Sequence, residues 1–497
     1  MLQIRDEDVL ARMRFDNPWW ETGVGSEEIA ALPERDYFPP FFELVNQTDP
    51  KRAIVLMGAR RVGKTVLMRQ AIGRLLRNGV PKQAILYLSI DAPLYGGLPL
   101  ETLLRLYLDT YGVPGQAWIF FDEIQYLKDW EVHLKSLVDS RPDIKFVVSG
   151  SAAAALRMKS RESGAGRFTD FLLPPLTFAE FLRLASPQTR IDVSTDEHGF
   201  QTFATEDIGA LNRQFVDYLN YGGYPELALS KTMRRDIERY VGSDIVEKVL
   251  LRDIPSLYGI GDVTELNNLF RVLAYNTSQE VSLEGLSQSS QISKNTIKRY
   301  IEYLEASFLI RTVERVDINA RRFERARNFK VYLTNPALRA ALFGPIDADD
   351  DRFGALVETG IFCQWFHNAS FQNDFRYARW KDGEVDLIYL GPSRQAPEWA
   401  IEIKWTDRYY SNPSELQSLL KFCKSNGFEF MEEGPLEGAV VTTRTKSGNM
   451  RLQGIPIAFL PSALHAYGVG YNIAAHNAKV LGGENNAELR LPEPQNP

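Results

Sequence analysis

The sequence predicts an α/β fold whose first domain is a parallel sheet that carries a phosphate-binding loop. Four short apolar runs, each the length of a buried strand, alternate with stretches of helical apolar spacing. That alternation is typical of a parallel sheet with helices on both faces. A G-x-x-x-x-G-K-S/T loop at 58–65 follows the first run directly, and the third run ends in the acids Asp122 and Glu123.

The composition is that of a globular chain with several domains. A length of 497 residues is too great for one ordinary core, so about three domains are expected. The net charge of −7 argues against a protein that coats nucleic acid indiscriminately, although a local basic face remains compatible with it. The only cysteines, Cys363 and Cys423, are too few for a disulfide framework or a four-cysteine zinc site, which suits the cytoplasm. The acidic N-terminus is no signal peptide, and no apolar run approaches membrane-spanning length.

Residues 1–50 are rich in aromatic residues and prolines, and we expect them to pack on the sheet domain, residues 51–185. The expected strands of that domain are 53–57, 84–88, 118–121 and 145–149. The apolar spacing after the first strand predicts a helix over 66–76.

The loop between the first strand and this helix predicts nucleotide binding. Its glycines allow backbone N–H groups to curl around the β-phosphate, and the positive end of the helix points at the same oxygens. Lys64 is expected to reach the β- and γ-phosphates, and Thr65 to ligate Mg2+. ATP is favoured because the chain contains no guanine-reading N-K-x-D stretch. The expected nucleotide contacts are Gly58, Ala59, Arg60, Arg61, Val62, Gly63, Lys64, Thr65 and Val66.

The acids after the third strand predict hydrolysis as well as binding. Asp122 would hold Mg2+ through its water shell, and Glu123 would orient and deprotonate the attacking water. The alternative, a strand that ends in surface acids, is disfavoured by the loop upstream.

The fourth strand ends in Ser149-Gly150-Ser151. Ser149 is a candidate contact for the γ-phosphate or the attacking water, with Ser151 second. The alternative for both is a helix N-cap for the alanine-rich stretch 152–156, which is the better interpretation for Ser151 and an equal one for Ser149. Farther on, a glycine-rich loop ends in Arg167, which would contact the γ-phosphate of its own or a neighbouring subunit. The alternative is that Arg167 is an ordinary surface arginine.

Residues 186–255 are expected to form a helical lid, with a polar insertion near 190–206 and a long helix over 237–252. Residues 256–325 predict a winged helix, because Ser293 caps a second helix whose Ile297, Ile301 and Leu304 face inward. A polar and basic outer face suits a DNA groove, and a solvated face or contact with another protein is an equal alternative. The outer residues are Lys294, Asn295, Lys298 and Arg299, and a dense basic cluster follows at Arg321, Arg322, Arg325, Arg327 and Lys330.

Residues 326–470 carry a third group of polar residues. Glu402 and Lys404 form an E-x-K strand and share a face, since residues two apart in a strand point the same way. Asp386 starts a neighbouring strand, and Glu358 lies on a predicted helix. Two carboxylates hold Mg2+ in many nucleases, so this order resembles the PD-(D/E)xK nuclease core. A nuclease-derived domain without cleavage is the alternative, and residues 471–497 are expected to be a flexible tail.

The order of parts resembles a bacterial and archaeal family of AAA-type ATPases with a C-terminal domain of unknown function, number 4143. The resemblance implies ATP hydrolysis, a winged helix, a restriction-endonuclease-like fold and a homo-oligomer, and it adds Arg252 to Arg167 as a candidate arginine finger. The chain departs from the family at 330–336, where an aspartate followed by a glycine is typical. The segments that carry the resemblance are 57–65, 121–125, 149–151, 166–167, 173–181, 222–226, 251–254, 384–386 and 402–405.

Three functions are compatible with the sequence. The first is an ATPase that remodels or processes DNA, including branched DNA such as Holliday junctions. The second is a nucleotide-controlled switch or defence regulator whose C-terminal domains bind protein. The third is an ATP-regulated, metal-dependent nuclease.

Overall fold

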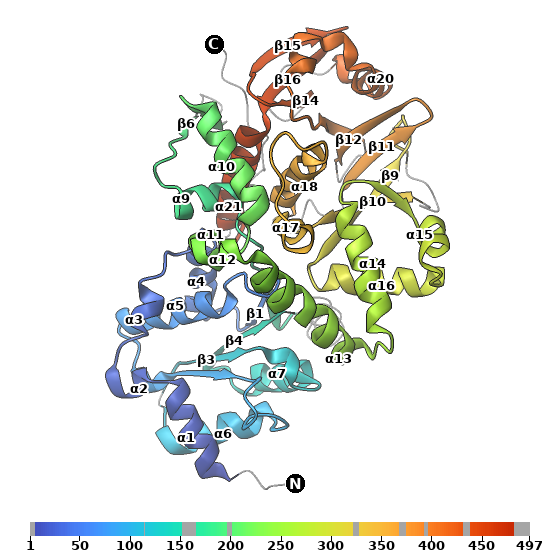
Figure 1. Ribbon diagram of the computed structural model, residues 1–497. Helices are drawn as coiled ribbons and strands as arrows, with labels where there is room; N and C mark the ends of the chain where they lie inside the picture. Colours follow the sequence, from blue (N-terminus) through green and yellow to red (C-terminus); the bar gives the residue numbers. More distant parts are fainter. Residues whose placement is uncertain are drawn as a thin grey trace. The chain divides into compact units, whose positions relative to one another are not determined.

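The chain forms two compact units (Figure 1). The first consists mainly of the described residues between 5 and 174, and the second mainly of those between 175 and 477. The computed structural model describes residues 5–113, 115–151, 166–195, 201–321, 328–366, 374–391, 396–430 and 438–481.

A five-stranded parallel sheet forms the core of the first unit, as the sequence predicts. The strand order is β2-β3-β4-β1-β5, so β4 lies between β1 and β3. The strands are β1 (Ala53–Met57), β2 (Ile85–Ser89), β3 (Ala117–Asp122), β4 (Ile144–Gly150) and β5 (Phe168–Leu172). The sequence does not predict β5, because Thr169 and Asp170 interrupt its apolar pattern, which is tolerated at the edge of a sheet.

Helices cover both faces of this sheet. The helix α5 (Lys64–Arg77) crosses from β1 to β2, and α6 (Leu100–Tyr111) and α7 (Trp130–Ser140) make the later crossovers. Right-handed crossovers place α5 on one face and α6 and α7 on the other, as Figure 1 shows. Two short 3-10 helices, η1 (Lys82–Ala84) and η2 (Ile124–Tyr126), complete the connections.

The first part of the N-terminal segment packs along the edge strand β2, and its last two helices contact α5. The segment comprises α1 (Asp6–Asp16), α2 (Trp19–Thr22), α3 (Glu27–Ala30) and α4 (Phe38–Asn46). The Asn17 amide donates to the Tyr87 carbonyl at 2.8 Å and accepts from the Tyr87 N–H at 2.6 Å, as a neighbouring strand would. The indoles of Trp19 and Trp20 donate to the Ile85 carbonyl. The segment therefore satisfies backbone groups that an edge strand would otherwise expose.

A nine-stranded sheet runs through the second unit in the order β15-β16-β14-β13-β12-β11-β9-β10-β8. The strands predicted for the winged helix join those predicted for the nuclease-like domain, because β11 pairs with β9 in parallel. The predicted boundary between residues 325 and 326 is therefore wrong, since β10 pairs with β8 and β9. The strands are β8 (Glu280–Ser282), β9 (Ile310–Val316), β10 (Asn328–Leu333), β11 (Phe375–Trp380), β12 (Gly383–Leu390), β13 (Pro397–Glu402), β14 (Gly438–Thr443), β15 (Gly448–Leu452) and β16 (Ile455–Pro461).

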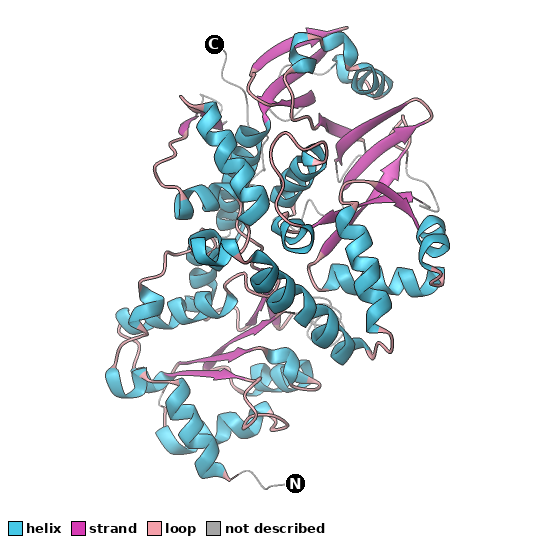
Figure 2. Cartoon of the chain, in the orientation of Figure 1, coloured by secondary structure: helices cyan, strands magenta, loops and turns pink. Residues whose placement is uncertain are grey.

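The first half of the second unit is mostly helical (Figure 2). The predicted polar insertion forms a hairpin of β6 (Asp192–Thr195) and β7 (Gln201–Ala204). The predicted helix at 237–252 is present with wide π-type turns, as η3 (Glu238–Glu247) and η4 (Val249–Asp253). The remaining helices there are α9 (Phe178–Ala185), α10 (Ile208–Tyr221), α11 (Pro225–Leu229), α12 (Lys231–Arg235), α13 (Ile254–Tyr258), α14 (Val263–Tyr275), α15 (Leu283–Ser290) and α16 (Lys294–Ala306).

The large sheet of the second unit has an apolar core on each face. Alternating residues of β12 face opposite sides, with Leu387 in the core of α18 and α21 and Ile388 in the core of α20. The predicted tail boundary at 470 is wrong, because α21 continues to Leu481; residues 482–497 lie outside the described part. The helices of this half are α17 (Ala337–Phe343), α18 (Phe353–Trp365), α19 (Arg408–Ser411), η5 (Pro413–Glu415), α20 (Gln417–Ser425), η6 (Phe428–Phe430) and α21 (Ser462–Leu481).

Within the described part of the chain, no helix is both long enough and apolar enough to cross a membrane.

Candidate functional site

The strand order brings three polar chain segments together at one end of the first sheet. The phosphate-binding loop follows β1, Asp122 ends β3, and Ser149 lies near the end of β4. Because β4 lies between β1 and β3, Ser149 is next to both of the others. In open parallel sheets, ligands bind outside the carboxyl ends of the strands, which is where these residues lie.

Two glycines of the loop are required by its geometry. A Cβ atom on Gly58 would lie 2.2 Å from the Leu173 carbonyl oxygen, and Gly63 has a left-handed φ of +100° just before α5. The buried Arg35 donates to the carbonyls of Val62 at 2.9 Å and Pro174 at 3.1 Å. Arg35 therefore ties the loop to the segment after β5, a role that its sequence position gave no reason to predict.

The first turn of α5 presents the residues expected to contact phosphate and metal. The Lys64 ammonium is buried and donates to the carbonyls of Gly58 at 2.9 Å and Ala59 at 2.8 Å. Arg61 is exposed, whereas Arg60 and Val66 are half-buried. The Thr65 hydroxyl donates to Asp122 Oδ2 at 2.7 Å.

Asp122 is a buried carboxylate held by neutral donors. Its Oδ2 accepts from the hydroxyls of Thr65 and Tyr87, each at 2.7 Å. Its Oδ1 accepts from the Ser149 hydroxyl and from the Glu123 N–H. Oxygen ligands of this kind suit Mg2+, so Thr65 and Asp122 fit the expected metal.

Glu123 lies beside this carboxylate in a left-handed conformation, with φ +53°. The Gln125 amide donates to its carboxylate and also to the Ser151 hydroxyl at 3.2 Å. Burial raises the pKa of Glu123, the nearby Lys64 opposes that rise, and the Asp122 charge adds to it. A carboxylate with a raised pKa is a stronger general base at neutral pH. The predicted N-cap role of Ser149 and Ser151 concerns residues 152–156, which lie outside the described residues.

Tyr87 is a site residue that the sequence analysis missed. Its hydroxyl reaches Asp122, and the Arg69 guanidinium lies 4.5 Å from the centre of its ring. Burial raises the pKa of the Tyr87 hydroxyl above its ordinary value. In the sequence it is one residue of the apolar run of β2, and only the adjacency of β2 and β3 indicates its role.

Arg167 does not reach its own phosphate-binding loop, so that part of the prediction is wrong. It precedes β5, whose first residue pairs with Ala53 at the start of β1. The loop follows the other end of β1, about 16 Å away at about 3.3 Å per strand residue. Arg167 pairs with Asp139 at 2.8 Å. Contact with a neighbouring subunit's nucleotide stays a prediction, as it does for Arg252, which is exposed on η4 in the second unit.

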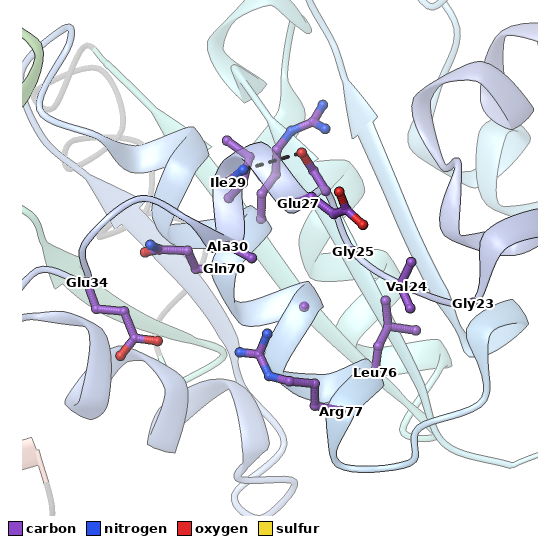
Figure 3. A pocket seen from close by; sticks show the side chains of 13 residues that line it. Gly23, Val24, Gly25, Glu27, Ile29, Ala30, Glu34, Gln70, Leu76 and Arg77 are labelled. Carbon is purple, nitrogen blue, oxygen red and sulfur yellow. Dashed lines mark hydrogen bonds between the residues drawn. The ribbon is translucent and has the colours of Figure 1, made fainter.

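A separate cavity of about 340 Å³ lies beside α5. Figure 3 shows it between the segment from Gly23 to Glu34 and the side chains of Gln70, Leu76 and Arg77. Its α5 residues lie C-terminal to the phosphate-binding turn, so the cavity is distinct from the predicted nucleotide contacts.

The predicted nuclease-like residues do come together in the second unit. Lys404 pairs with Glu402 at 2.8 Å and with Asp386 at 3.3 Å. The Ile403 N–H donates to Asp386 Oδ2 at 2.9 Å. However, no group of three His, Cys, Asp or Glu side chains is arranged to hold a metal ion in the described ranges. The magnesium site expected at the two carboxylates Asp386 and Glu402 stays a prediction.

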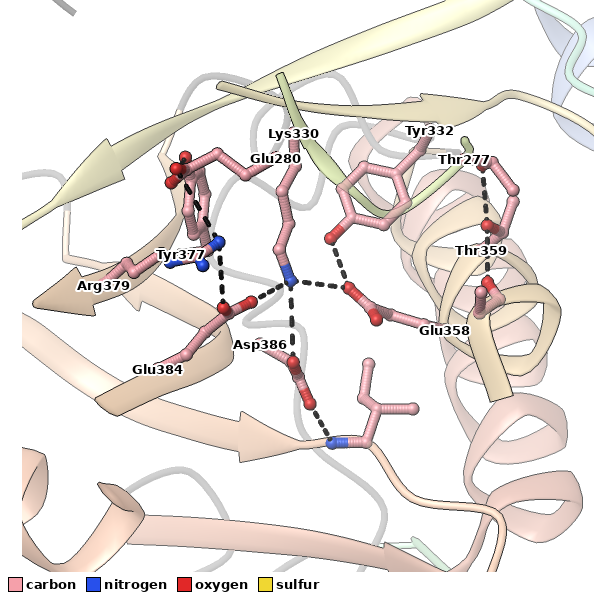
Figure 4. A network of polar contacts seen from close by, with 12 residues as sticks. Thr277, Glu280, Lys330, Tyr332, Glu358, Thr359, Tyr377, Arg379, Glu384 and Asp386 are labelled. Carbon is pink, nitrogen blue, oxygen red and sulfur yellow. Dashed lines mark hydrogen bonds and ion pairs between the residues drawn. The ribbon is translucent and has the colours of Figure 1, made fainter. Parts of the chain in front are cut away.

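Lys330, which the sequence analysis counted in a dense basic cluster, lies among these carboxylates. It is on β10, is 3% exposed and points into them, so it is not part of an exposed basic surface. Its ammonium lies 3.0 Å from Glu358, 2.7 Å from Glu384 and 3.6 Å from Asp386 (Figure 4). Glu358 therefore joins the group through Lys330.

The outer face of α16 agrees with its predicted orientation. Lys294, Asn295, Lys298 and Arg299 are exposed, whereas Ile297, Ile301 and Leu304 are buried. The Ser293 hydroxyl accepts from the Thr296 N–H at 3.2 Å, which is the predicted cap. Lys294 pairs with Glu284. Arg321 is exposed, and Arg322 lies outside the described residues.

Comparison with known families identifies an AAA domain over residues 50–182. A second family, the domain of unknown function DUF8612, matches residues 212–349. This differs in identity and position from the domain 4143 that the resemblance implied. The second match runs from α10 to beyond α17 and crosses the predicted boundary at 325, in agreement with the continuous sheet.

Three relatives carry no functional description. The uncharacterised protein MJ1637 of Methanocaldococcus jannaschii is 24% identical over 420 residues, which is 80% of this chain and 84% of the relative. MJ1544 of the same organism is 21% identical over 365 residues, covering 72% and 77%. An uncharacterised protein of Haemophilus influenzae is 25% identical over 330 residues, covering 65% and 76%.

Solved structures with some similarity include the replication initiator DnaA bound to AMPPCP and single-stranded DNA. Its sequence identity is 13% and its TM-score is 0.26, with 54% of this chain and 86% of that chain covered. The AAA domain of FIGL-1 in complex with ADP has 16% identity and a TM-score of 0.27, with 50% and 85% covered.

Proposed function

We propose that the AAA domain binds ATP with Mg2+ and hydrolyses it. The observation that carries this proposal is the contact set around Asp122, in which Thr65 of the loop, Ser149 of β4 and the backbone of Glu123 meet one carboxylate. A phosphate loop, a metal-holding pair and a base within one contact network are the parts that phosphoryl transfer to water requires.

Each residue then has a defined task. The backbone of residues 58–66 surrounds the phosphates, and Lys64 turns its ammonium from the loop carbonyls to the β- and γ-phosphates. Thr65 and Asp122 hold Mg2+, which neutralises charge on the phosphate oxygens. Glu123 takes the proton of the attacking water, and Ser149 orients that water or the γ-phosphate. Gln125 holds the Glu123 carboxylate in place.

We propose that the arginine finger comes from a second copy of the chain. The position of Arg167 at the far end of the sheet leaves only a neighbour's nucleotide within its reach, and Arg252 is the alternative. An equimolar mixture of Lys64→Ala and Arg167→Ala proteins should hydrolyse ATP when neither does alone, because each supplies what the other lacks. A mixture as inactive as its components would exclude Arg167 from this role.

The central test separates binding from hydrolysis. Glu123→Gln should bind a fluorescent ATP analogue normally while steady-state turnover falls about 100-fold, the usual contribution of a general base. Lys64→Ala should lose binding, and Glu43→Gln, an exposed glutamate on α4, should change neither. Turnover of Glu123→Gln at the wild-type rate would contradict the proposal that Glu123 is the general base.

We further propose that α14, α15 and α16 with β8, β9 and β10 form a winged helix that contacts DNA. The exposed Lys298 and Arg299 on α16, backed by buried Ile297 and Ile301, support this assignment. Duplex or four-way DNA would then stimulate ATP hydrolysis, and the work done on DNA would be remodelling or processing.

Anisotropy with labelled duplex, single-stranded and four-way DNA tests the contact. Lys298→Ala with Arg299→Ala should weaken binding and reduce the salt slope by about 2, since each lost phosphate contact removes about 0.9. Lys421→Ala with Lys424→Ala removes two exposed lysines from α20 and should leave binding unchanged. Equal affinities for both double variants, together with a stable protein partner, would favour the nucleotide-controlled switch instead.

A further inference from the structure

A buried ammonium lies beside Asp386, one of the two carboxylates that would hold a metal ion in the nuclease-like arrangement. The side chain of Lys330 is 3% exposed, and those of Glu358 and Asp386 are 12% and 11% exposed. On β10, Lys330 and Tyr332 are two residues apart and therefore share a face. Both reach the same oxygen of Glu358, Lys330 at 3.0 Å and Tyr332 at 2.6 Å.

We propose that Lys330 takes the place of a divalent cation in this cluster. The domain of β10 to β16 then folds and functions without a bound metal, and it does not cleave a phosphodiester at Asp386. The cluster serves instead as an internal ion network that joins β10 to α18 and β12.

The distances fit an ammonium. Lys330 donates a hydrogen bond to Glu358 at 3.0 Å and forms ion pairs with Glu384 at 2.7 Å and with Asp386 at 3.6 Å. A bound Mg2+ would need oxygens at about 2.0 to 2.1 Å, and Ca2+ at about 2.3 to 2.6 Å. A metal ion beside this ammonium would also bring two cations together in a poorly solvated place, where like charges repel strongly.

The oxygens of Asp386 are already used by this chain. Oδ2 accepts from the Ile403 N–H at 2.9 Å and from Lys404 at 3.3 Å. Oδ1 faces Lys330 at 3.6 Å. A metal ion at Asp386 would have to share this carboxylate with two ammoniums, those of Lys404 at 3.3 Å and Lys330 at 3.6 Å.

The network extends beyond the lysine and ties several strands together. Arg379 on β11 lies 3.5 Å from Glu384 and 3.7 Å from Glu280 of β8. The Tyr377 hydroxyl donates to Glu280 at 2.7 Å, and the Lys330 ammonium lies 5.3 Å from the centre of the Tyr377 ring. Figure 4 shows these side chains converging from β8, β10, β11, β12 and α18. The lysine thus connects the strands of the proposed winged helix to those of the nuclease-like sheet.

The test is the uptake of Mn2+ by nucleotide-free full-length protein, followed by electron paramagnetic resonance. Wild type and Asp386→Asn should take up the same amount of Mn2+, and neither should nick supercoiled plasmid. Lys330→Met frees the carboxylates without changing the side-chain length much, so it should gain one Mn2+ per chain and melt at a higher temperature with Mn2+ than without it. Lys381→Met, an exposed lysine in the turn between β11 and β12, should show neither gain.

Two results would overturn the proposal. One is Mn2+ uptake by wild type that Asp386→Asn loses, and the other is plasmid nicking that Asp386→Asn abolishes. If Lys330→Met does not fold, the comparison of wild type with Asp386→Asn still tests whether Asp386 binds a metal ion, because both proteins retain Lys330. ATP turnover, measured on the same samples, reports separately on the AAA domain.

Discussion

The two units each hold a buried aspartate on a strand, Asp122 at the end of β3 and Asp386 within β12, and they satisfy it in opposite ways. Asp122 accepts from three hydroxyls and one backbone N–H, all of them neutral. Asp386 is flanked by two lysine ammoniums and one backbone N–H. Neutral donors orient a carboxylate without neutralising its negative charge. That charge can then attract a cation that enters the site together with a ligand. Ammonium donors offset the charge of the carboxylate within the chain itself.

This contrast separates two aspartates that look equivalent in the sequence. Both begin or end apolar strands, and both have an acid or an E-x-K pair nearby. The residues that differ, Tyr87 and Lys330, come from other strands. A buried aspartate is therefore assigned to metal binding or to structure by its partners, and the strongest tests change those partners.

Removing the ammonium should have the largest effect. Lys330→Met removes the buried cation that Glu358, Glu384 and Asp386 share, so the free energy of unfolding of the second unit should fall by about 3 to 5 kcal/mol. Urea denaturation measures the change. Lys381→Met should stay within about 0.5 kcal/mol of wild type, as exposed substitutions do. A loss for Lys330→Met no larger than for Lys381→Met would mean that the network contributes little.

A pH series should have an intermediate effect on the same unit. Burial raises the pKa of both Glu358 and Glu402 to about 7, from an ordinary value of 4.5. Between these values the folded state keeps a proton that the unfolded chain releases. The free energy of unfolding therefore falls as pH rises from about 4.5 to about 7, and it levels off above that window.

The carboxamide variants identify the source of this dependence. Urea denaturation from about pH 5 to pH 8 should show a shallower fall for Glu358→Gln, and a shallower one still with Glu402→Gln added, since neither amide titrates. Stability that rises with pH through this window would show that the carboxylates are ionised in the folded state throughout.

The elements expected near contiguous motifs agree with the structure, whereas the positions of Lys330 and Arg167 depend on strand order and were not predicted. The loop at 58–65 and the acids at 122–123 each consist of adjacent residues, so their chemistry can be predicted from the sequence alone. Lys330 is 28 residues from Glu358 and lies on a strand that is not adjacent to β12, so its burial follows only from the continuous sheet. The predicted contact of Arg167 with its own loop is wrong for a related reason. Its glycine-rich surroundings suggest a phosphate contact, but the parallel direction of β5 places it at the opposite end of the sheet.

The smallest expected effect concerns Tyr87, and it tests whether a neutral donor matters to Asp122, the aspartate that we propose to hold Mg2+. Tyr87→Phe removes one of the four donors to Asp122 while the ring remains under Arg69. A hydrogen bond to a charged group contributes about 1.5 to 3 kcal/mol, but Thr65 and Ser149 still hold the carboxylate, so we expect the loss at the lower limit. Turnover should then fall about tenfold, and the Mg2+ concentration for half-maximal rate should change, because Oδ2 loses a competing donor.

Tyr95→Phe provides the matched control, since the Tyr95 hydroxyl donates to Asp16 in the N-terminal segment at 2.8 Å. If both variants lower turnover equally at every Mg2+ concentration, Tyr87 acts on the fold of the unit. A shift in the Mg2+ dependence confined to Tyr87→Phe would instead place it at the metal-holding carboxylate, where neutral donors set how readily Asp122 accepts a cation.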